Sequence, residues 1–523
     1  MTPSSVRIVI GQSDLQQISP GAIILSVQVT HAINDHSTCE IRLRQTRDRP
    51  FDLTKFYFKQ IDIFATVAPG LEIPLYGGFI DSRVRQRHDT SGAVELVVST
   101  RGDTALMEES HLQTFLGVSF ETKIKTFTDR VGTLEPAIVV DNQDAVQFCN
   151  GFYQLGETDW QHLLAEASSL GVMLFPDGDK LFAMDHFQPS PTTLRFSDEG
   201  GLLAFEVRAA FQPALWRATF YDREKFLSDT VNDVKDDVKR FGSAAALCDQ
   251  VVADNTLGAP NAARPEVLAL SKEVVEQVLK ADSRRAIANA VRGVGESREG
   301  ALLIGRTVTI EGADEIAGTW GVIRVVHKFS PTTGYINEFE CTPFDSPLCM
   351  PAVPFPRVTA PLHGRVTSAP SKDLIRVQFP WEKGDESLFM RWLTPMAGAD
   401  RGFCFPPEVG DEVLVQFANG DSTSDPFIAA AVWNGQERPP LEDVFGKEVE
   451  NNDIKRLVTK SGNRLVMDDK NGKETIVVAT PKHVRVSLFD GGSTLLLHSD
   501  GDIHLNAGGT VHMKCKQFLR EVG

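Results

Sequence analysis

Residues 403–435 read FCFPPEVGDEVLVQFANGDSTSDPFIAAAVWNG and decide the fold of the region around them. Val413, Val415 and Phe417 share one parity, so DEVLVQF is predicted to be a strand with a buried face. The Asn419-Gly420-Asp421 turn tolerates the positive φ angle that a chain reversal needs. FIAAAVW then returns as a second strand. The stretch predicts a β-hairpin in a small barrel or sandwich.

Length and charge limit the class of protein. A chain of 523 residues is too long for one core and is expected to form three or four domains. It has 53 basic and 70 acidic residues, a net charge of −17, which disfavours nucleic acid and anionic membranes as partners. The N-terminal MTPSSVRIVIGQSD lacks the pattern of a Sec signal, and no apolar run is long enough to span a bilayer. We expect cytoplasmic synthesis and no stable membrane insertion.

The seven cysteines are scattered and include no C-x-x-C pair, so a disulfide scaffold or a zinc site is not expected. They are Cys39, Cys149, Cys248, Cys341, Cys349, Cys404 and Cys515.

The N-terminal region is predicted to be mainly β with some α. Its first hundred residues contain short alternating runs separated by turn residues, typical of an antiparallel barrel or sandwich. A helix is predicted at Thr158–Leu170, with a Thr158–Gln161 capping box and Gly171 as its C-terminal stop. A hairpin should turn at Asp177-Gly178-Asp179, and a second helix is expected near Ser271–Val291. Residues 226–265 are weakly patterned and are predicted to be a surface loop.

Proline and polar spacers divide the chain. Five prolines between Cys341 and Arg357 mark a stiff linker. The predicted domains are an N-terminal region 1–345, a linker 346–355, a barrel 356–440, a spacer 441–458 and a tail 459–523.

The tail carries a repeat of eight residues. Two apolar series recur at this period, while Gly501 and Gly509 keep the same spacing. Glycine-paced short strands are typical of a β-helix or prism. One copy would leave both strand edges unpaired, whereas three intertwined chains would bury the repeat. The predicted trimer-core stripe consists of Leu495, Leu497, Ile503, Leu505, Val511 and Met513.

The barrel segment resembles the barrel of VgrG proteins, the spikes of type VI secretion systems and related contractile injection machines. The resemblance rests on VQFPW, RWLTP, GFCFPPEVGDEVLVQF, the NGD turn and VWNG. FYQLGETDWQHLLAEASSLGVMLF and GTWGVIRVVHKFSPTTGYINEFECTP are similar to the tail-hub domain of this family and to phage late-control proteins. SGNRLVMDDKNGKETI resembles the start of its needle. The resemblance implies tail-hub β-barrel domains, an OB-fold barrel and a trimeric β-helix or prism needle.

The same resemblance implies a structural role without catalysis or cofactor. A homotrimeric hub and spike would cap an inner tube and puncture the target envelope when a sheath contracts. Its implied partners are an Hcp-like tube ring, baseplate proteins and a PAAR-type tip protein, with effector cargo possible. The protein would be exported or delivered with the particle.

Catalytic motifs are weak in this sequence. It contains no H-E-x-x-H, P-loop or G-x-S-x-G motif, and we interpret His31 and His36 as turn or surface residues. In the tail, His504 and His512 have the opposite parity to the apolar stripe, so they are predicted to face solvent, and Cys515 is interpreted as a buried thiol. A tail-associated cell-wall hydrolase remains an alternative, although no carboxylate pair stands out.

An oligonucleotide-binding module is the second alternative, because many OB-folds bind single strands through aromatic residues. Residues 356–440 hold eight Lys or Arg against eleven Asp or Glu, so a basic groove is not expected. We therefore interpret the aromatic residues as core and subunit-packing residues. They are Phe379, Trp381, Phe389, Trp392, Phe403, Phe405, Phe417, Phe427 and Trp433.

Overall fold

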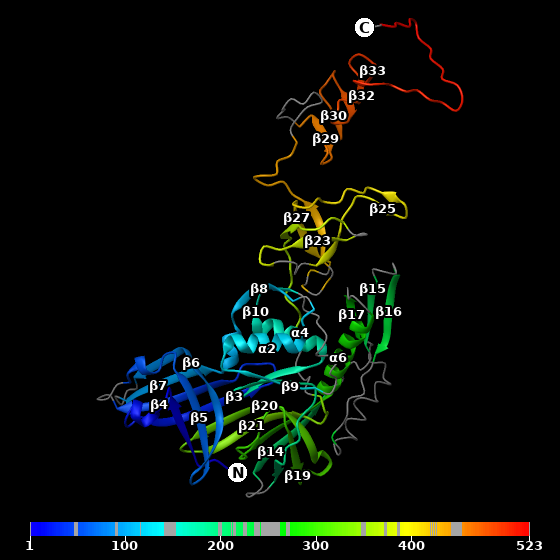
Figure 1. The fold of residues 1–523 in the computed structure, drawn as a ribbon. Coiled ribbons are helices and arrows are strands. Elements are labelled where there is room, and N and C mark those ends of the chain that lie inside the picture. The colour runs from blue at the N-terminus through cyan, green and yellow to red at the C-terminus, as the bar shows by residue number, and fades with distance from the viewer. Residues whose placement is uncertain are drawn as a thin grey trace. The chain divides into compact units, whose positions relative to one another are not determined.

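The computed structural model of the single chain contains two compact units, residues 1–431 and 432–523 (Figure 1). The structure describes residues 2–46, 51–88, 93–115, 117–140, 153–196, 201–210, 212, 216–222, 227–234, 241, 262–267, 272–346, 352–370, 374–383, 388–418, 420, 422, 424, 426–440 and 452–521.

The first unit contains a 13-stranded sheet. The alternating runs of the first hundred residues, which predicted an antiparallel barrel or sandwich, form strands of this sheet. In β7 (Ala93–Arg101) every second residue is buried, which is the pattern of a strand with one face on a core. The path of the sheet is β14-β18-β21-β20-β3-β4-β7-β6-β5-β1-β2, and β13 and β19 pair beside it. The other strands are β1 Ser5–Ile10, β2 Ser13–Asp14, β3 Ile23–Ala32, β4 Thr38–Thr46, β5 Gln60–Ala68, β6 Leu71–His88, β13 Thr193–Arg195, β14 Leu202–Ala209, β18 Val291–Ser297, β19 Thr307–Glu311, β20 Gly318–Ser330 and β21 Gly334–Thr342.

Helices and small sheets accompany this sheet in the same unit. The predicted helix is α4, Asp159–Leu170, and both halves of its capping box form. Gly171 adopts φ 77°, the left-handed conformation that glycine reaches without strain. The second predicted helix is α6, Lys272–Ala290. The described residues also contain the helices α1 Leu15–Ile18 and α2 Phe120–Val131, and the 3-10 turns η1 Leu53–Lys55, η2 Asp103–Met107 and η5 Asp314–Ile316.

Two short sheets, and a third that packs against α6, lie in the region before the barrel. The predicted hairpin is β11 (Met173–Asp177) with β12 (Lys180–Met184), and β9 (Glu135–Val139) pairs parallel to it. β8 (Ser110–Thr114) pairs with β10 (Tyr153–Thr158).

The expectation of a loop over residues 226–265 is wrong in part. β16 (Leu227–Val234) and β17 (Ala262–Val267) both pair with β15 (Trp216–Asp222) in a three-stranded sheet. Val231 and Ala218 of this sheet are buried in a small core with Val275 and Leu279 of α6. The packing against α6 supplies the apolar contacts that the weak strand pattern lacks.

Helices α2 and α4 share buried ionic groups and lie beside each other in Figure 1. Lys123 Nζ lies 2.7 Å from Glu166 Oε2, and both side chains are fully buried. His162 Nδ1 lies 3.0 Å from Glu157 Oε1, while His162 Nε2 lies 3.8 Å from Glu166. The Phe115 ring lies 4.8 Å from Lys123 Nζ and adds a cation–π contact.

Two histidines face each other inside the large sheet. His327 is 2% exposed, its Nδ1 lies 2.6 Å from the Tyr335 hydroxyl, and its ring lies 5.8 Å from that of His31. Burial, with a smaller contribution from His31, lowers the pKa of His327 to about 3. Burial also lowers the pKa of His31. Both imidazoles are therefore neutral in the folded protein at neutral pH.

This burial predicts loss of stability in acid. The folded pKa of His327 lies below its unfolded value of about 6.5, so its contribution is complete above pH 6.5 and declines as the pH falls toward 3. We expect the free energy of unfolding to drop by roughly 1.4 kcal/mol per pH unit for this group. Urea unfolding between pH 7 and 4 should show a shallower decline for His327→Gln. An equal decline in both proteins would contradict the assignment.

A closed five-stranded barrel follows, in the order β22-β23-β24-β28-β27. The predicted hairpin is β27 (Glu412–Phe417) with β28 (Pro426–Ala431), and Gly420 in its turn adopts φ 70°. Asn419 and Asp421 of this turn lie outside the described residues. The remaining strands are β22 Leu362–Val366, β23 Ile375–Gln378 and β24 Phe389–Trp392, with a small ribbon of β25 Ala397–Gly398 and β26 Arg401–Gly402.

The barrel core includes a residue from the N-terminal region. Tyr153 of β10 is 1% exposed and belongs to the apolar cluster of the barrel. Its ring lies 5.7 Å from Phe379 and 5.4 Å from Phe417, both edge-on. Thr114 of β8 donates a hydrogen bond of 2.6 Å to Glu382. Strands β8 and β10 are therefore in contact with the barrel within the first compact unit.

The second unit contains an antiparallel sheet in the order β29-β30-β31-β32-β33. Its strands are β29 Ile454–Val458, β30 Arg464–Asp468, β31 Thr475–Ala479, β32 Arg485–Phe489 and β33 Thr494–His498. The strands follow one another as a meander, so the first part of the predicted needle is a sheet in the single chain.

Candidate assembly surface

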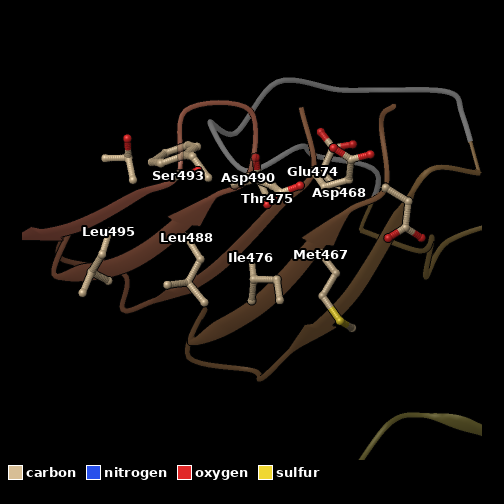
Figure 2. Close-up of a pocket in the computed structure, with 12 residues that line it drawn as sticks. Met467, Asp468, Glu474, Thr475, Ile476, Leu488, Asp490, Ser493 and Leu495 are labelled. Atoms are coloured by element: carbon tan, nitrogen blue, oxygen red, sulfur yellow. The ribbon is translucent and has the colours of Figure 1, made fainter. Parts of the chain in front are cut away.

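Two ladders of apolar side chains cross the face of the sheet in the second unit. In the first ladder, strand pairing places Met467 beside Ile476, then Leu488, then Leu495. Figure 2 shows these four side chains in a row on one side of the sheet. In the second ladder, pairing aligns Leu457, Leu465, Val478, Val486 and Leu497. We call these two ladders together the apolar ladder face.

The apolar ladder face is open in the single chain. Ile476 is 42% exposed, Leu488 46% and Leu495 61%. On the opposite face Val466 and Val477 are at most 3% exposed. An antiparallel sheet at the surface of a monomer normally buries one apolar face and presents polar residues on the other. Apolar residues on both faces indicate that a second layer covers the open one.

Two shallow grooves follow the ladders. A groove of about 490 Å³ runs along the first ladder, and a groove of about 370 Å³ runs along the second. Three carboxylates border the first groove, those of Asp468, Glu474 and Asp490. In Figure 2 they lie above the row of apolar side chains. The grooves are shallow and largely apolar, which suits packing by another sheet.

The predicted trimer-core stripe divides between two environments. Leu495 and Leu497 lie on β33, one in each ladder. Ile503, Leu505, Val511 and Met513 lie in residues 499–521, which form no helix or strand, and their side chains are 50–66% exposed. The structure of one chain brings Leu495 and Leu497 together with the ladders and does not bring the other four to them. The burial of this stripe between copies stays a prediction.

Sequence reasoning missed most of the ladder. The face is carried by Met467, Ile476, Val478, Val486 and Leu488. Val478 and Val486 are eight residues apart, but the other spacings do not follow the eight-residue repeat. Their signal is parity, since TIVVA and RVSLF place exposed apolar residues at alternate positions. Parity combined with hairpin pairing, rather than a fixed period, identifies this surface.

A second apolar patch lies on the barrel. Leu393 is 62% exposed, Met396 57%, and Phe403 and Phe405 are 46% and 51%, with their rings 4.6 Å apart. The other predicted aromatic residues divide between core and surface. Phe379 and Phe417 are buried, Trp381 and Trp392 pack at the edge of the core, and Phe389 and Trp433 are exposed.

The histidines noted in the sequence make contacts with protein groups. His31 lies 2.8 Å from both Ser37 Oγ and the Leu75 carbonyl, and His36 lies 2.8 Å from Glu108. His504 is exposed beside Asp502. Within the described ranges, no three His, Cys, Asp or Glu side chains are placed to hold one metal ion. Cys515, predicted to be buried, is exposed in the single chain.

Comparison with known sequences identifies the barrel. Residues 362–433 match the family model of the Type VI secretion system/phage-baseplate injector OB domain. The chain is 31% identical over 161 residues to the type VI secretion system spike protein VgrG4b of Pseudomonas aeruginosa, covering 28% of this chain and 20% of that protein. It is 28% identical over 177 residues to the actin cross-linking toxin VgrG1 of Vibrio cholerae, covering 31% of this chain and 15% of that protein. The aligned segments thus span at most a fifth of these two relatives.

Solved structures share the fold over a longer range. The E. coli c3393 protein, a type VI secretion component described as similar to the T4 tail proteins gp27 and gp5, aligns with TM-score 0.55 and 13% identity. The alignment covers 81% of this chain and 99% of that one. A chain of the Francisella PdpA-VgrG complex in its half-lidded form aligns with TM-score 0.57 and 9% identity over 95% of this chain and 88% of that one.

Residues 362–433 therefore form an injector OB domain, and the fold of the chain is shared with components of type VI secretion systems. In sequence, the chain is similar to VgrG spike proteins over part of its length. In the part of the chain that the structure covers, no helix is both long and apolar enough to cross a membrane.

Proposed function

We propose that this protein is the structural central spike and baseplate hub of a contractile injection system, of the type VI or phage-tail kind. One observation carries the proposal: an injector OB barrel is followed later in the chain by a sheet with apolar residues on both faces. A sheet of this kind needs a second layer, and other copies of the same chain supply one with matching ladders. Three copies around one axis would bury the ladders and the apolar residues of the tail together.

The mechanical role follows from the bonds that such an assembly contains. A spike must resist axial load without unfolding. Interwound strands do so because their backbone hydrogen bonds and buried side chains must be broken together. The Tyr153 anchor passes load from the barrel to the hub within the first unit. In this proposal the chain acts without catalysis, and no bound cofactor takes part.

Partners follow from the same proposal. The hub end would seat on an Hcp-like tube ring and on baseplate proteins. The needle end would accept a PAAR-type tip protein, with or without effector cargo. The protein would be made in the cytoplasm, assembled into the particle and delivered on contraction.

The proposal predicts a trimer in solution. Sedimentation equilibrium of the purified full chain should give about 172 kDa, three times the chain mass of 57.5 kDa. A folded protein that stays at 57.5 kDa at micromolar concentration would contradict the proposal.

A further inference from the structure

A separate cavity of about 680 Å³ lies in the N-terminal region of the first unit. It is bordered by β5 and β6, by the 3-10 turn η2 and by the turn between β11 and β12. Its size falls within the range of pockets that hold a small ligand or a peptide side chain. The proposed spike function leaves this cavity without a role.

The charge of the cavity is negative. Four carboxylates line it, those of Asp62, Asp103, Asp177 and Asp179, and no lining residue is Lys or Arg. Arg306 reaches one of them from outside, 3.8 Å from Asp177. Burial, with a smaller contribution from the charge of Asp103, raises the pKa of Asp62. A cation in the cavity would relieve this unfavourable burial of charge.

The one basic side chain in the wall does not supply that cation. Burial lowers the pKa of His31, so its imidazole is neutral at neutral pH. It already contacts Ser37 Oγ and the Leu75 carbonyl. Apart from the charge of Asp177, which Arg306 approaches, the negative charge of the cavity is therefore available to a ligand.

The spacing of the carboxylates favours an organic cation over a metal ion. The described residues contain no cluster of three His, Cys, Asp or Glu that could share one ion. The carboxylates are instead interleaved with aromatic walls, which include Phe64, Tyr76 and Phe79. Aromatic faces attract guanidinium and ammonium groups, and guanidinium also stacks on them.

The rim of the cavity presents apolar side chains to solvent. Phe58 is 79% exposed and is held at φ 56°, a left-handed conformation that is uncommon for a bulky residue. Leu106 on η2 is 46% exposed. An exposed aromatic residue beside buried carboxylates matches a docking site for a protein segment that carries a cation among apolar residues.

The same chemistry already occurs beside the cavity. The guanidinium of Arg7 lies 4.6 Å from the ring centre of Phe64 and pairs with Glu72 at 2.6 Å. The ring of Phe64 and the carboxylate of Glu72 thus both contact the guanidinium of Arg7.

We propose that this cavity binds an arginine side chain presented by an exposed segment of a partner protein. Arginine fits better than lysine because its planar guanidinium stacks on a ring while it pairs with two carboxylates. The backbone of the partner segment would lie across Phe58 and Leu106. The proposal does not depend on the spike function.

The test uses the full chain and a pair of isosteric peptides. The probes are acetyl-Gly-Arg-Gly-amide and the same peptide with citrulline, which keeps the shape of arginine and lacks its charge. Titration followed by saturation-transfer NMR should give the arginine peptide an affinity at least about tenfold higher, since a charged hydrogen bond contributes this much. Equal binding of the two peptides would overturn the proposal.

Variants locate the site. Asp62→Asn with Asp103→Asn should reduce binding of the arginine peptide at least about tenfold. This variant should fold, because it removes a buried carboxylate whose ionisation burial disfavours, and an unchanged melting temperature confirms it. The matched control, Asp129→Asn with Asp314→Asn, neutralises two exposed carboxylates outside the cavity and should bind as the wild type does. Unchanged binding in the cavity variant, or equal losses in both, would refute the proposal.

A third binding measurement, with free L-arginine, distinguishes a protein segment from a free metabolite as the ligand. Free L-arginine has the same net charge of +1 as the peptide amide, because its α-ammonium offsets its carboxylate. It lacks the flanking backbone that would lie across Phe58 and Leu106, so it should bind more weakly than the peptide amide. Tighter binding of free L-arginine would reject the protein partner.

Discussion

Replacing Leu488 by Asp is expected to convert the assembled protein into single chains of 57.5 kDa. Leu488 lies in the middle of the first ladder, between Ile476 and Leu495, and is 46% exposed in one chain. In an assembly that covers the ladder, each copy would bury an unpaired carboxylate, which costs several kcal/mol per ion. In the separate chain the same carboxylate stays in water and costs about 0.5 kcal/mol or less. Sedimentation equilibrium would measure the mass, and circular dichroism would check the fold.

Leu71→Asp is the matched control for this experiment. Leu71 is also 46% exposed but lies at the start of β6 in the first unit. This variant should keep the mass of the assembly. If Leu488→Asp also keeps that mass, the apolar ladder face is not the contact between copies.

Replacing Lys123 by Met is expected to destabilise the first unit by about 3–5 kcal/mol. The side chains of Lys123 and Glu166 are both fully buried, so this variant leaves a carboxylate in the core without the ammonium 2.7 Å away. Urea unfolding followed by tryptophan fluorescence would measure the change, because Trp160 lies on α4 with Glu166. Lys123→Met with Glu166→Leu should recover most of the loss, since neither charge is then buried.

Lys125→Met provides the control on the same helix. Lys125 is exposed on α2, two residues from Lys123, and its replacement should change the free energy of unfolding by about 0.5 kcal/mol or less. A loss of about 3 kcal/mol in this control, or none in Lys123→Met, would show that the buried pair does not stabilise the helices.

Local signals predicted much of the fold. The sequence predicts α4 from its capping residues Thr158, Gln161 and Gly171, because capping groups act within one helical turn. The strands of the opening hairpin follow from parity over a few residues. Helix α2 was missed, although Ser119 caps its start and Gly132 ends it at φ 75°. Its apolar residues Phe120, Ile124, Phe127 and Val131 also follow helical spacing, so both the caps and the apolar face were available as signals.

Features that depend on distant residues were not accessible to sequence reasoning. Lys123 and Glu166 are 43 positions apart, and no local pattern predicts that they meet. The cavity combines groups from seven separated segments of the chain, from His31 to Ile304. In the ladder, hairpin register aligns Ile476 with Leu488 across a gap of twelve residues. A search for a constant period finds the tail but overlooks this alignment.

Tyr153 has a practical consequence for protein engineering. The match to the injector OB domain begins at residue 362, yet the barrel interior is completed by a ring supplied more than two hundred positions earlier. A transplanted barrel cut at the domain boundary would carry a void where that phenol belongs. Chimaeras between injection proteins should therefore exchange β8 and β10 along with the barrel, or fill the gap by redesign.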